Sequence, residues 1–371
     1  MNAITAIDAE RRARGRMSRY AKPLYSKKQV NRAGDFLAQP IDKQLDMAWE
    51  DWEYWLQVIN NFRAVHAHPL NTFQTTLRIK GRQIDPDIIV AQRVKRLSSI
   101  RAKLVRFPLM TLSQMQDIGG CRGIVTSAEG VDELAASYLS SNLKHKLHTD
   151  DDYVRHPKAT GYRGRHLIYR YYSDKVDTYN GLKIEMQLRS QFQHAWATAV
   201  EIVGTFTRQA LKSSQGEEDW LRFFALMGSA IARIEGTPLV PGTPTNDDDL
   251  ILELKDAEHN LDAMRRLRAF STAPMEIETV GLGRKNHFFL LELNLKTNEL
   301  NIKGYPANQL DQASVQYLDA EKRLGTDVSA DAVLVSVESL AALRKAYPNY
   351  YLDTDLFVEL VDDAMAGAFI Q

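Results

Sequence analysis

The stretch that decides the fold is LKIEMQLRS, residues 182–190. Apolar and polar residues alternate along it, and a period of two indicates a strand with one face in a core. A second strand-like run covers Arg165–Tyr172, and Asn180-Gly181 between the two runs suits a hairpin turn with positive φ. We therefore expect a β-hairpin here, with a row of polar side chains along one face of its second strand.

A helix is expected directly after this hairpin. Ser190 is followed three residues later by Gln193, which is a capping-box pattern, and the helix should run to about Leu211. The polar row on the preceding strand consists of Lys183, Glu185, Gln187 and Arg189. Taken alone, such a row is more typical of a solvated outer face than of a binding site. The motifs around this row, described below, favour a binding site instead.

Upstream of the hairpin, the pattern predicts alternating helices and strands. The aromatic periodicity of residues 42–66 predicts a long helix that Pro69 ends. Other expected elements are a strand at 88–94, a helix from Ser98 or Ser99 through Lys103, a strand at 118–125 and a helix at 131–139. Pro86 could instead begin one long helix through the 88–103 region. The expected fold class is α+β, with a mixed sheet flanked by helices.

The chain is expected to divide near residue 240, because residues 236–249 are rich in Pro, Gly and Asp. We expect a flexible basic arm at 1–25, a first domain at 26–240 and a smaller α+β domain at 241–371. That last domain should contain helices at 250–268 and 311–324, strands at 286–293, 299–305 and 332–337, and helices on either side of Pro348. No catalytic constellation is visible in it.

Composition excludes several protein classes. With 44% hydrophobic and 25% charged residues, the chain is typical of a soluble globular protein and not of a disordered or collagenous one. A single cysteine excludes an internal disulfide, no apolar run is long enough to span a bilayer, and no signal peptide is visible, so we expect a cytoplasmic protein. The net charge of zero hides a basic segment, 1–123, with 21 basic and 11 acidic residues, and an acidic segment, 217–371, with 14 and 26.

Three groups of residues could bind a nucleotide. The loop KATGYRGRH, residues 158–166, combines glycines, cations and an aromatic ring, which suits phosphate binding and base stacking. A second basic cluster spans residues 93–106. Two carboxylates on separate strands, Asp117 and Glu185, could hold a Mg²⁺ ion that bridges a triphosphate.

In this order along the chain, these motifs resemble those of the RelA/SpoT synthetase domain. The matching segments are RVKRLSSIRAK at 93–103, DIGGCR at 117–122, DYVRHPKATGYRGRH at 152–166, EMQLRS at 185–190 and HAWA at 194–197 with Glu201. Each motif alone is weak, but their order over about 110 residues is specific. The resemblance covers roughly residues 40–235 and implies a nucleotidyltransferase-like synthetase domain.

The resemblance implies transfer of the β,γ-pyrophosphate of ATP to the ribose 3′-hydroxyl of GDP or GTP, which makes guanosine tetra- and pentaphosphate. It assigns Mg²⁺ to Asp117 and Glu185, with Glu185 also helping to deprotonate the hydroxyl. It assigns ATP phosphates to Arg93, Lys95 and Lys103, and adenine to Arg122. Tyr162 would stack on the acceptor base, while the acceptor and phosphates would be oriented by Lys158, Arg163, His166, Gln187 and Arg189.

Departures from the family pattern leave alternatives open. Many members have Ser where this chain has Gly164, and Asp151 replaces a usual lysine, so the acceptor could instead be tRNA or an adenosine nucleotide, as in toxic members. Strict alternation puts Asp117 and Arg122 on opposite faces, so the resemblance requires a bulge or bend, for which Gly119-Gly120 is well suited. No adjacent His-Asp pair suggests the family's hydrolase domain. A third hypothesis is a sensor whose last domain binds a protein or ligand and controls the synthetase; a homo-oligomer is also open.

Overall fold

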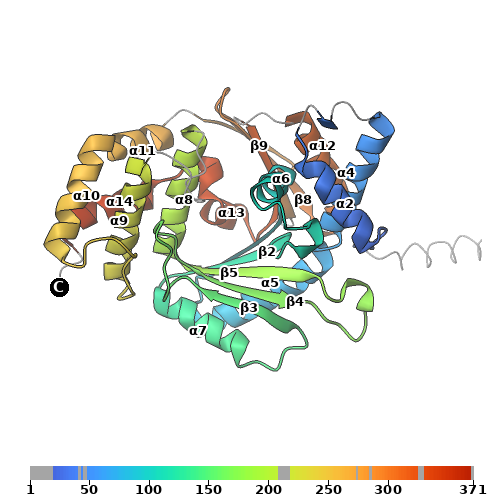
Figure 1. Cartoon of the computed structure of the whole chain (residues 1–371), viewed down its shortest axis with the longest axis horizontal. Coiled ribbons are helices and arrows are strands. Elements are labelled where there is room, and N and C mark those ends of the chain that lie inside the picture. The colour runs from blue at the N-terminus through green and yellow to red at the C-terminus, as the bar shows by residue number, and fades with distance from the viewer. Residues whose placement is uncertain are drawn as a thin grey trace, which may run out of the picture.

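The computed structural model describes residues 20–40, 43–44, 48–207, 218–272, 275–283, 286–324 and 330–368. The expected flexible arm at 1–25 therefore falls largely outside the described residues. In the part that is described, helices cover both faces of a large mixed sheet (Figure 1). The expected α+β fold class, with a mixed sheet flanked by helices, is confirmed.

The sheet contains nine strands among the described residues, in the order β3-β4-β5-β2-β1-β9-β7-β8-β6. Their bounds are β1 Ile89–Val94, β2 Gly119–Val125, β3 Lys146–Asp152, β4 Arg165–Arg170, β5 Lys183–Ser190, β6 Glu276–Val280, β7 Asn286–Asn294, β8 Glu299–Pro306 and β9 Ala330–Ser336. β2 pairs with β5 in parallel and β6 pairs with β8 in parallel, while the other neighbours are antiparallel.

The hairpin that the sequence predicts is present as β4 and β5. Gly181 has a φ of 86°, a conformation that favours glycine, whereas Asn180 before it has a φ of −63°. The capping box is also present, because the Ser190 side chain accepts from the Gln193 backbone N–H and the Gln193 side chain bonds back to the Ser190 backbone. It begins α8, Gln191–Phe206.

A predicted helix end is wrong, and a polar strand was not predicted. The predicted helix 42–66 is α4, Trp49–Ala64, and Pro69 does not end it but lies in the first turn of a further helix, α5, Ala67–Ile84. Proline is tolerated there because the first N–H groups of a helix have no partner within the helix. Strand β3 was not expected, since its sequence KLHTDDD is polar; it forms one edge of the sheet and is not fully buried.

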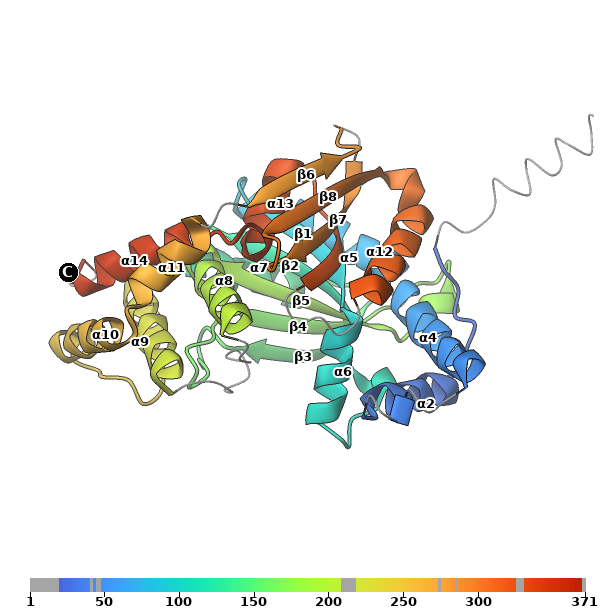
Figure 2. The ribbon, with the colours of Figure 1, turned by 90° about the horizontal axis from the view of Figure 1, so that it is seen from above.

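The remaining helices take their places around this sheet (Figure 2). They are α2 Lys27–Ala38, α6 Leu97–Arg106, α7 Ala128–Leu139, α9 Glu218–Ile234, α10 Asp247–Leu261, α11 Ala263–Thr272, α12 Leu310–Leu324, α13 Leu340–Ala346 and α14 Asp355–Met365. α5 and α7 pack on one face of β1, β2 and β5. α8 and α13 pack on the other face, and α9, α10, α11 and α14 gather at one end of the molecule.

The sheet continues across the boundary expected near residue 240. β9 pairs with β1 at Gln92 opposite Ser336 and Arg93 opposite Val335. Helix α14 joins the core formed by α8 and α9, where the rings of Phe224 and Phe357 lie 5.7 Å apart. Residues 241–371 are therefore joined to the preceding part by backbone pairing and by a shared core. Among the described residues, no helix is both long and apolar enough to cross a membrane.

Candidate active site

The site begins with the register of three adjacent strands. Arg93 on β1 lies opposite Gly120 on β2, and Gly120 lies opposite Glu185 on β5. Since glycine has no side chain, a hollow remains between the other two residues. A Cβ atom built on Gly120 would lie 3.9 Å from Oε2 of Glu185 and would point into this hollow.

A small, partly open cavity of about 50 Å³ occupies this position. Its lining residues are Ala91, Arg93, Lys95, Asp117, Gly120, Cys121, Arg122, Glu185, Gln187 and Tyr347. The cavity thus brings together six of the twelve residues that the sequence singled out: Arg93, Lys95, Asp117, Arg122, Glu185 and Gln187. Lys103 joins them through its bond to Asp117.

Two lysines hold the Asp117 carboxylate. Nζ of Lys95 and Nζ of Lys103 each lie 2.9 Å from one of its oxygens. Burial would raise the pKa of Asp117, but the two ammonium groups outweigh it and lower the pKa to about 2. Asp117 precedes β2, whose pairing with β1 and β5 has no register shift. The predicted bulge at Gly119-Gly120 is therefore wrong, because Asp117 reaches the cavity from the loop before the strand.

The Glu185 carboxylate has a different set of partners. Nδ1 of His166 lies 3.0 Å from one oxygen, and Nε2 of Gln187 donates to the other at 2.7 Å. Burial would raise the pKa of Glu185, yet His166 holds it below its usual value. The same pairing, together with Tyr162, raises the pKa of His166 to about 9 against the effect of burial. Glu185 is therefore an ionised carboxylate at neutral pH.

Tyr162 is connected to this carboxylate through His166. Its hydroxyl oxygen lies 2.6 Å from Nε2 of His166 and accepts from Arg189 at 2.7 Å. The ring is only 8% exposed and packs edge-on against Trp196, so little of its face is open to a stacking base.

The loop that contains Tyr162 also contains Lys158 and Gly164. Lys158 is exposed, and its Nζ lies 4.1 Å from the centre of the Tyr153 ring. Gly164 has a φ of 141°, which favours glycine and disfavours a residue with a side chain, such as serine.

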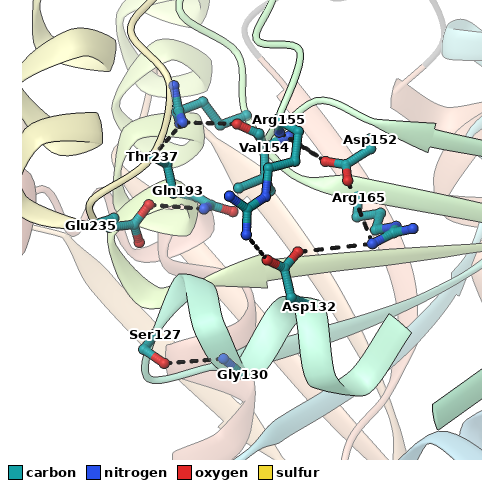
Figure 3. Close-up of polar contacts among 11 residues, drawn as sticks. Ser127, Gly130, Asp132, Asp152, Val154, Arg155, Arg165, Gln193, Glu235 and Thr237 are labelled. Atoms are coloured by element: carbon teal, nitrogen blue, oxygen red, sulfur yellow. Dashed lines mark hydrogen bonds and ion pairs between the residues drawn. The ribbon is translucent and has the colours of Figure 1, made fainter. Parts of the chain in front are cut away.

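Arg163 is not among the residues that line the cavity, and it ties this loop to the turn after α9. Its guanidinium donates to the backbone oxygens of Pro238 at 2.8 Å and Val154 at 3.0 Å, and to the Thr237 hydroxyl at 2.5 Å. Next to it, Gln193 of α8 donates to Glu235 at 2.9 Å (Figure 3). The structure therefore places Arg163 in a structural network, apart from the other predicted site residues.

Replacing Arg163 by Met is expected to destabilise the fold by about 3 kcal/mol, since three acceptors at the loop lose a largely buried donor. Urea unfolding measures this change. Arg155→Met is the matched control, because Arg155 pairs with Asp132 at the surface and should contribute less than about 1 kcal/mol. Equal stability of the two variants would contradict this assignment.

Three arginines, Arg93, Arg122 and Arg189, lie close together near the cavity, and Glu201 offsets part of the charge of Arg93 and Arg122. Burial and the neighbouring charges of Arg189 and Arg93 lower the pKa of Arg122 to about 10. Crowding of like charges is unfavourable unless an anion offsets it. The arrangement is therefore suited to a strongly anionic ligand.

Sequence reasoning did not identify Tyr347, which lines the same cavity from the far end of the chain. The Arg122 guanidinium lies 5.7 Å from the centre of the Tyr347 ring and donates to the backbone oxygen of Ala346 at 3.2 Å. The ring Nε2 of His194 in α8 lies 3.1 Å from the backbone oxygen of Lys345. The end of α13 thus covers Arg122, the residue expected to bind adenine. No local sequence pattern predicts this contact.

Comparison with known proteins agrees with the motifs. Residues 92–203 match the model for a region found in RelA / SpoT proteins. GTP pyrophosphokinase YjbM of Bacillus subtilis (strain 168) is 30% identical over 115 residues, which are 30% of this chain and 54% of that protein. Uncharacterized protein Rv1366 of Mycobacterium tuberculosis is 26% identical over 186 residues, which are 50% of this chain and 60% of that protein. The chain thus spans little more than half of these curated relatives.

Solved structures give matches at lower identity. Small alarmone synthetase 1 from Bacillus subtilis, bound to its product pppGpp, is 21% identical, with a TM-score of 0.41 over 50% of this chain and 94% of that one. A GTP pyrophosphokinase family protein from Streptococcus pneumoniae is 20% identical, with a TM-score of 0.41 over 59% of this chain and 98% of that one. On the match of residues 92–203, which supply every cavity residue except Ala91 and Tyr347, this chain contains a RelA/SpoT region.

Proposed function

We propose that this protein transfers the β,γ-pyrophosphate of ATP to the ribose 3′-hydroxyl of GDP or GTP. The observation that carries the proposal is one cavity that joins two carboxylates, Asp117 and Glu185, to the cations of residues 93–122. Transfer of a phosphoryl-type group depends mainly on positioning and on cations that offset its charge. The match of residues 92–203 to a region found in RelA / SpoT proteins, which includes these side chains, supports the proposal.

The residues at the cavity fit a Mg²⁺ ion. Magnesium in nucleotide sites is held by one or two carboxylates together with substrate phosphates, and Asp117 and Glu185 are such a pair. Among the described residues, no group of three or more His, Cys, Asp or Glu could form a cage made by protein alone. The ion would supply charge neutralisation between the phosphates. Lys95 and Lys103, now bonded to Asp117, would then turn to phosphate oxygens.

The residues around Glu185 suit proton transfer. In the proposed reaction the 3′-hydroxyl of the acceptor attacks the β-phosphorus of ATP, the bond to the α-phosphate oxygen breaks, and AMP leaves. Glu185 is ionised and can accept the hydroxyl proton. His166 orients the Glu185 carboxylate and stabilises its charge at 3.0 Å. We also place Gln187, Arg189 and Lys158 beside the acceptor and its phosphates.

A second candidate function is control of this activity by the C-terminal residues. It is favoured by the position of Ala346 and Tyr347 over Arg122, since a bound adenine would need that surface. The protein would then be a sensor, in which a ligand or protein that binds residues 241–371 moves α13 and opens the site. This cover lies over the expected ATP site, so it would limit the reaction with any of the possible acceptors.

An acceptor panel tests the proposal. Purified full-length protein is incubated with Mg²⁺, γ-labelled ATP and one acceptor at a time: GDP, GTP, AMP or deacylated tRNA. We expect label in a guanosine nucleotide. Label only in tRNA or only in an adenosine nucleotide would overturn the choice of acceptor and favour the toxic branch of the family. The panel is repeated with Tyr347→Ala, so that a covered site is not mistaken for an inactive one.

A further inference from the structure

The turn between β1 and α6, residues 95–97, is held by a helix of the C-terminal part. Oε1 of Glu321, on α12, accepts a hydrogen bond from the Leu97 backbone N–H at 3.0 Å. Glu321 also pairs with Arg63 of α4 at 2.7 and 3.0 Å. Nε of Arg63 in turn donates to the backbone oxygen of Lys95 at 3.0 Å. The two charged side chains therefore hold both sides of the turn.

Burial makes this arrangement rigid. The Arg63 side chain is 3% exposed and that of Glu321 is 11% exposed. Tyr317, one helical turn before Glu321, accepts from Arg63 at 2.8 Å and donates to Glu321 at 2.7 Å. A buried, hydrogen-bonded ion pair of this kind has a defined geometry, because its desolvated groups have no alternative partners.

Helix α6 depends on Glu321 for its N-terminal cap. Its N-cap residue, Arg96, makes no side-chain capping bond. The first N–H groups of a helix need acceptors from outside the helix, and a negative charge near them is stabilising. Glu321 supplies both an acceptor and a negative charge at Leu97, the first residue of α6. The cap thus comes from a residue more than two hundred positions away in the chain.

The turn and the helix carry the lysines that bond Asp117. Lys95 is in the turn itself and Lys103 is on α6, and each places Nζ 2.9 Å from Asp117. We infer that Glu321 and Arg63 are positioning residues, which set Lys95 and Lys103 at the place where the phosphates of ATP bind. This inference rests on the proposed function. It makes helix α12 a part of the ATP site, distinct from the cover formed by α13.

The test replaces the whole pair, because removing one partner would leave a buried charge and could unfold the protein. The full-length variant Arg63→Met/Glu321→Met keeps side-chain volume but removes the acceptor of Leu97 and the donor to Lys95. Glu292→Met/Arg323→Met is the matched control, since Arg323 of α12 pairs with Glu292 at 2.8 Å away from the turn. Glu321→Gln keeps an acceptor for Leu97 while it weakens the ion pair.

Three quantities are measured for each variant: the unfolding temperature, amide hydrogen exchange of peptides covering residues 95–106, and affinity for a methylene-bridged ATP analogue. Affinity is measured with and without Tyr347→Ala. For the Met pair we expect an unfolding temperature near that of wild type, faster exchange over 95–106 and about tenfold weaker analogue binding. Glu321→Gln should lie between, and the control should match wild type.

Each other outcome has a definite meaning. If the Met pair unfolds at the wild-type temperature and also exchanges and binds the analogue as wild type does, the pair does not position the two lysines and the inference is overturned. The inference would also be overturned if the control variant showed equally fast exchange over residues 95–106 and equally weak binding of the analogue. If the Met pair exchanges faster but no form of the protein binds the analogue, the turn is positioned as inferred and the proposed function fails instead.

Discussion

Replacing Glu185 by Gln is expected to lower the rate of pyrophosphate transfer about a thousandfold. The amide keeps the size of the side chain but can neither accept the hydroxyl proton nor hold Mg²⁺ as a carboxylate does. Loss of one well-placed charged group in an active site commonly has an effect of this order. Initial rates with saturating ATP and GDP measure it, and Asp117→Asn is expected to behave similarly.

The control for this prediction is Glu338→Gln. Glu338 is a carboxylate at the surface, where it pairs with Arg78 at 2.7 Å, so its variant should retain wild-type rates. Circular dichroism and unfolding temperatures check that both variants fold. Full activity of folded Glu185→Gln with every acceptor would show that Glu185 is not a catalytic residue.

Replacing Tyr347 by Ala is expected to raise activity at low ATP concentration by at least about tenfold. The ring lies over Arg122 and lines the cavity, so its removal opens the surface expected to bind adenine. Tenfold in affinity corresponds to about 1.4 kcal/mol, which is a modest value for loss of a contact that competes with a ligand. The KM for ATP should fall while kcat changes less, since Tyr347 touches none of the reacting groups.

Tyr347→Phe is the matched variant, because it keeps the ring and removes only the weak bond from its hydroxyl to the Gln92 backbone oxygen at 3.4 Å. Tyr347→Phe should have the wild-type KM for ATP and the wild-type activity at low ATP concentration. Since Tyr347 is buried, unfolding temperatures accompany both measurements. A folded Tyr347→Ala protein with an unchanged or higher KM for ATP would contradict a covering role for α13.

Local patterns predicted much of the fold around the site. The alternation of residues 182–189, the glycine at 181 and the capping box at 190 each act over a few residues, and all three are present in the structure. The strands at 88–94 and 118–125 were also predicted from local patterns. Together with β5 they place Arg93 and Glu185 on either side of Gly120.

Features that depend on distant parts of the chain could not be predicted in this way. Tyr347 reaches the cavity only because β9 pairs with β1 and places α13 over the site. Arg163 has the sequence context of a ligand-binding residue, but the turn at Pro238 supplies acceptors that direct it elsewhere. Strand β3 is polar because it forms a sheet edge, and a polar edge has no hydrophobic period to detect.

The most direct test of the pyrophosphokinase proposal is the identity of the second product. Full-length protein and its Tyr347→Ala variant are incubated with Mg²⁺, GDP and ATP labelled in the adenine ring, and the adenine nucleotides are separated. Transfer of pyrophosphate predicts one AMP formed for each guanosine nucleotide modified at its 3′ position, with no ADP. Formation of ADP in step with the product, or no modified guanosine nucleotide from either protein, would contradict it.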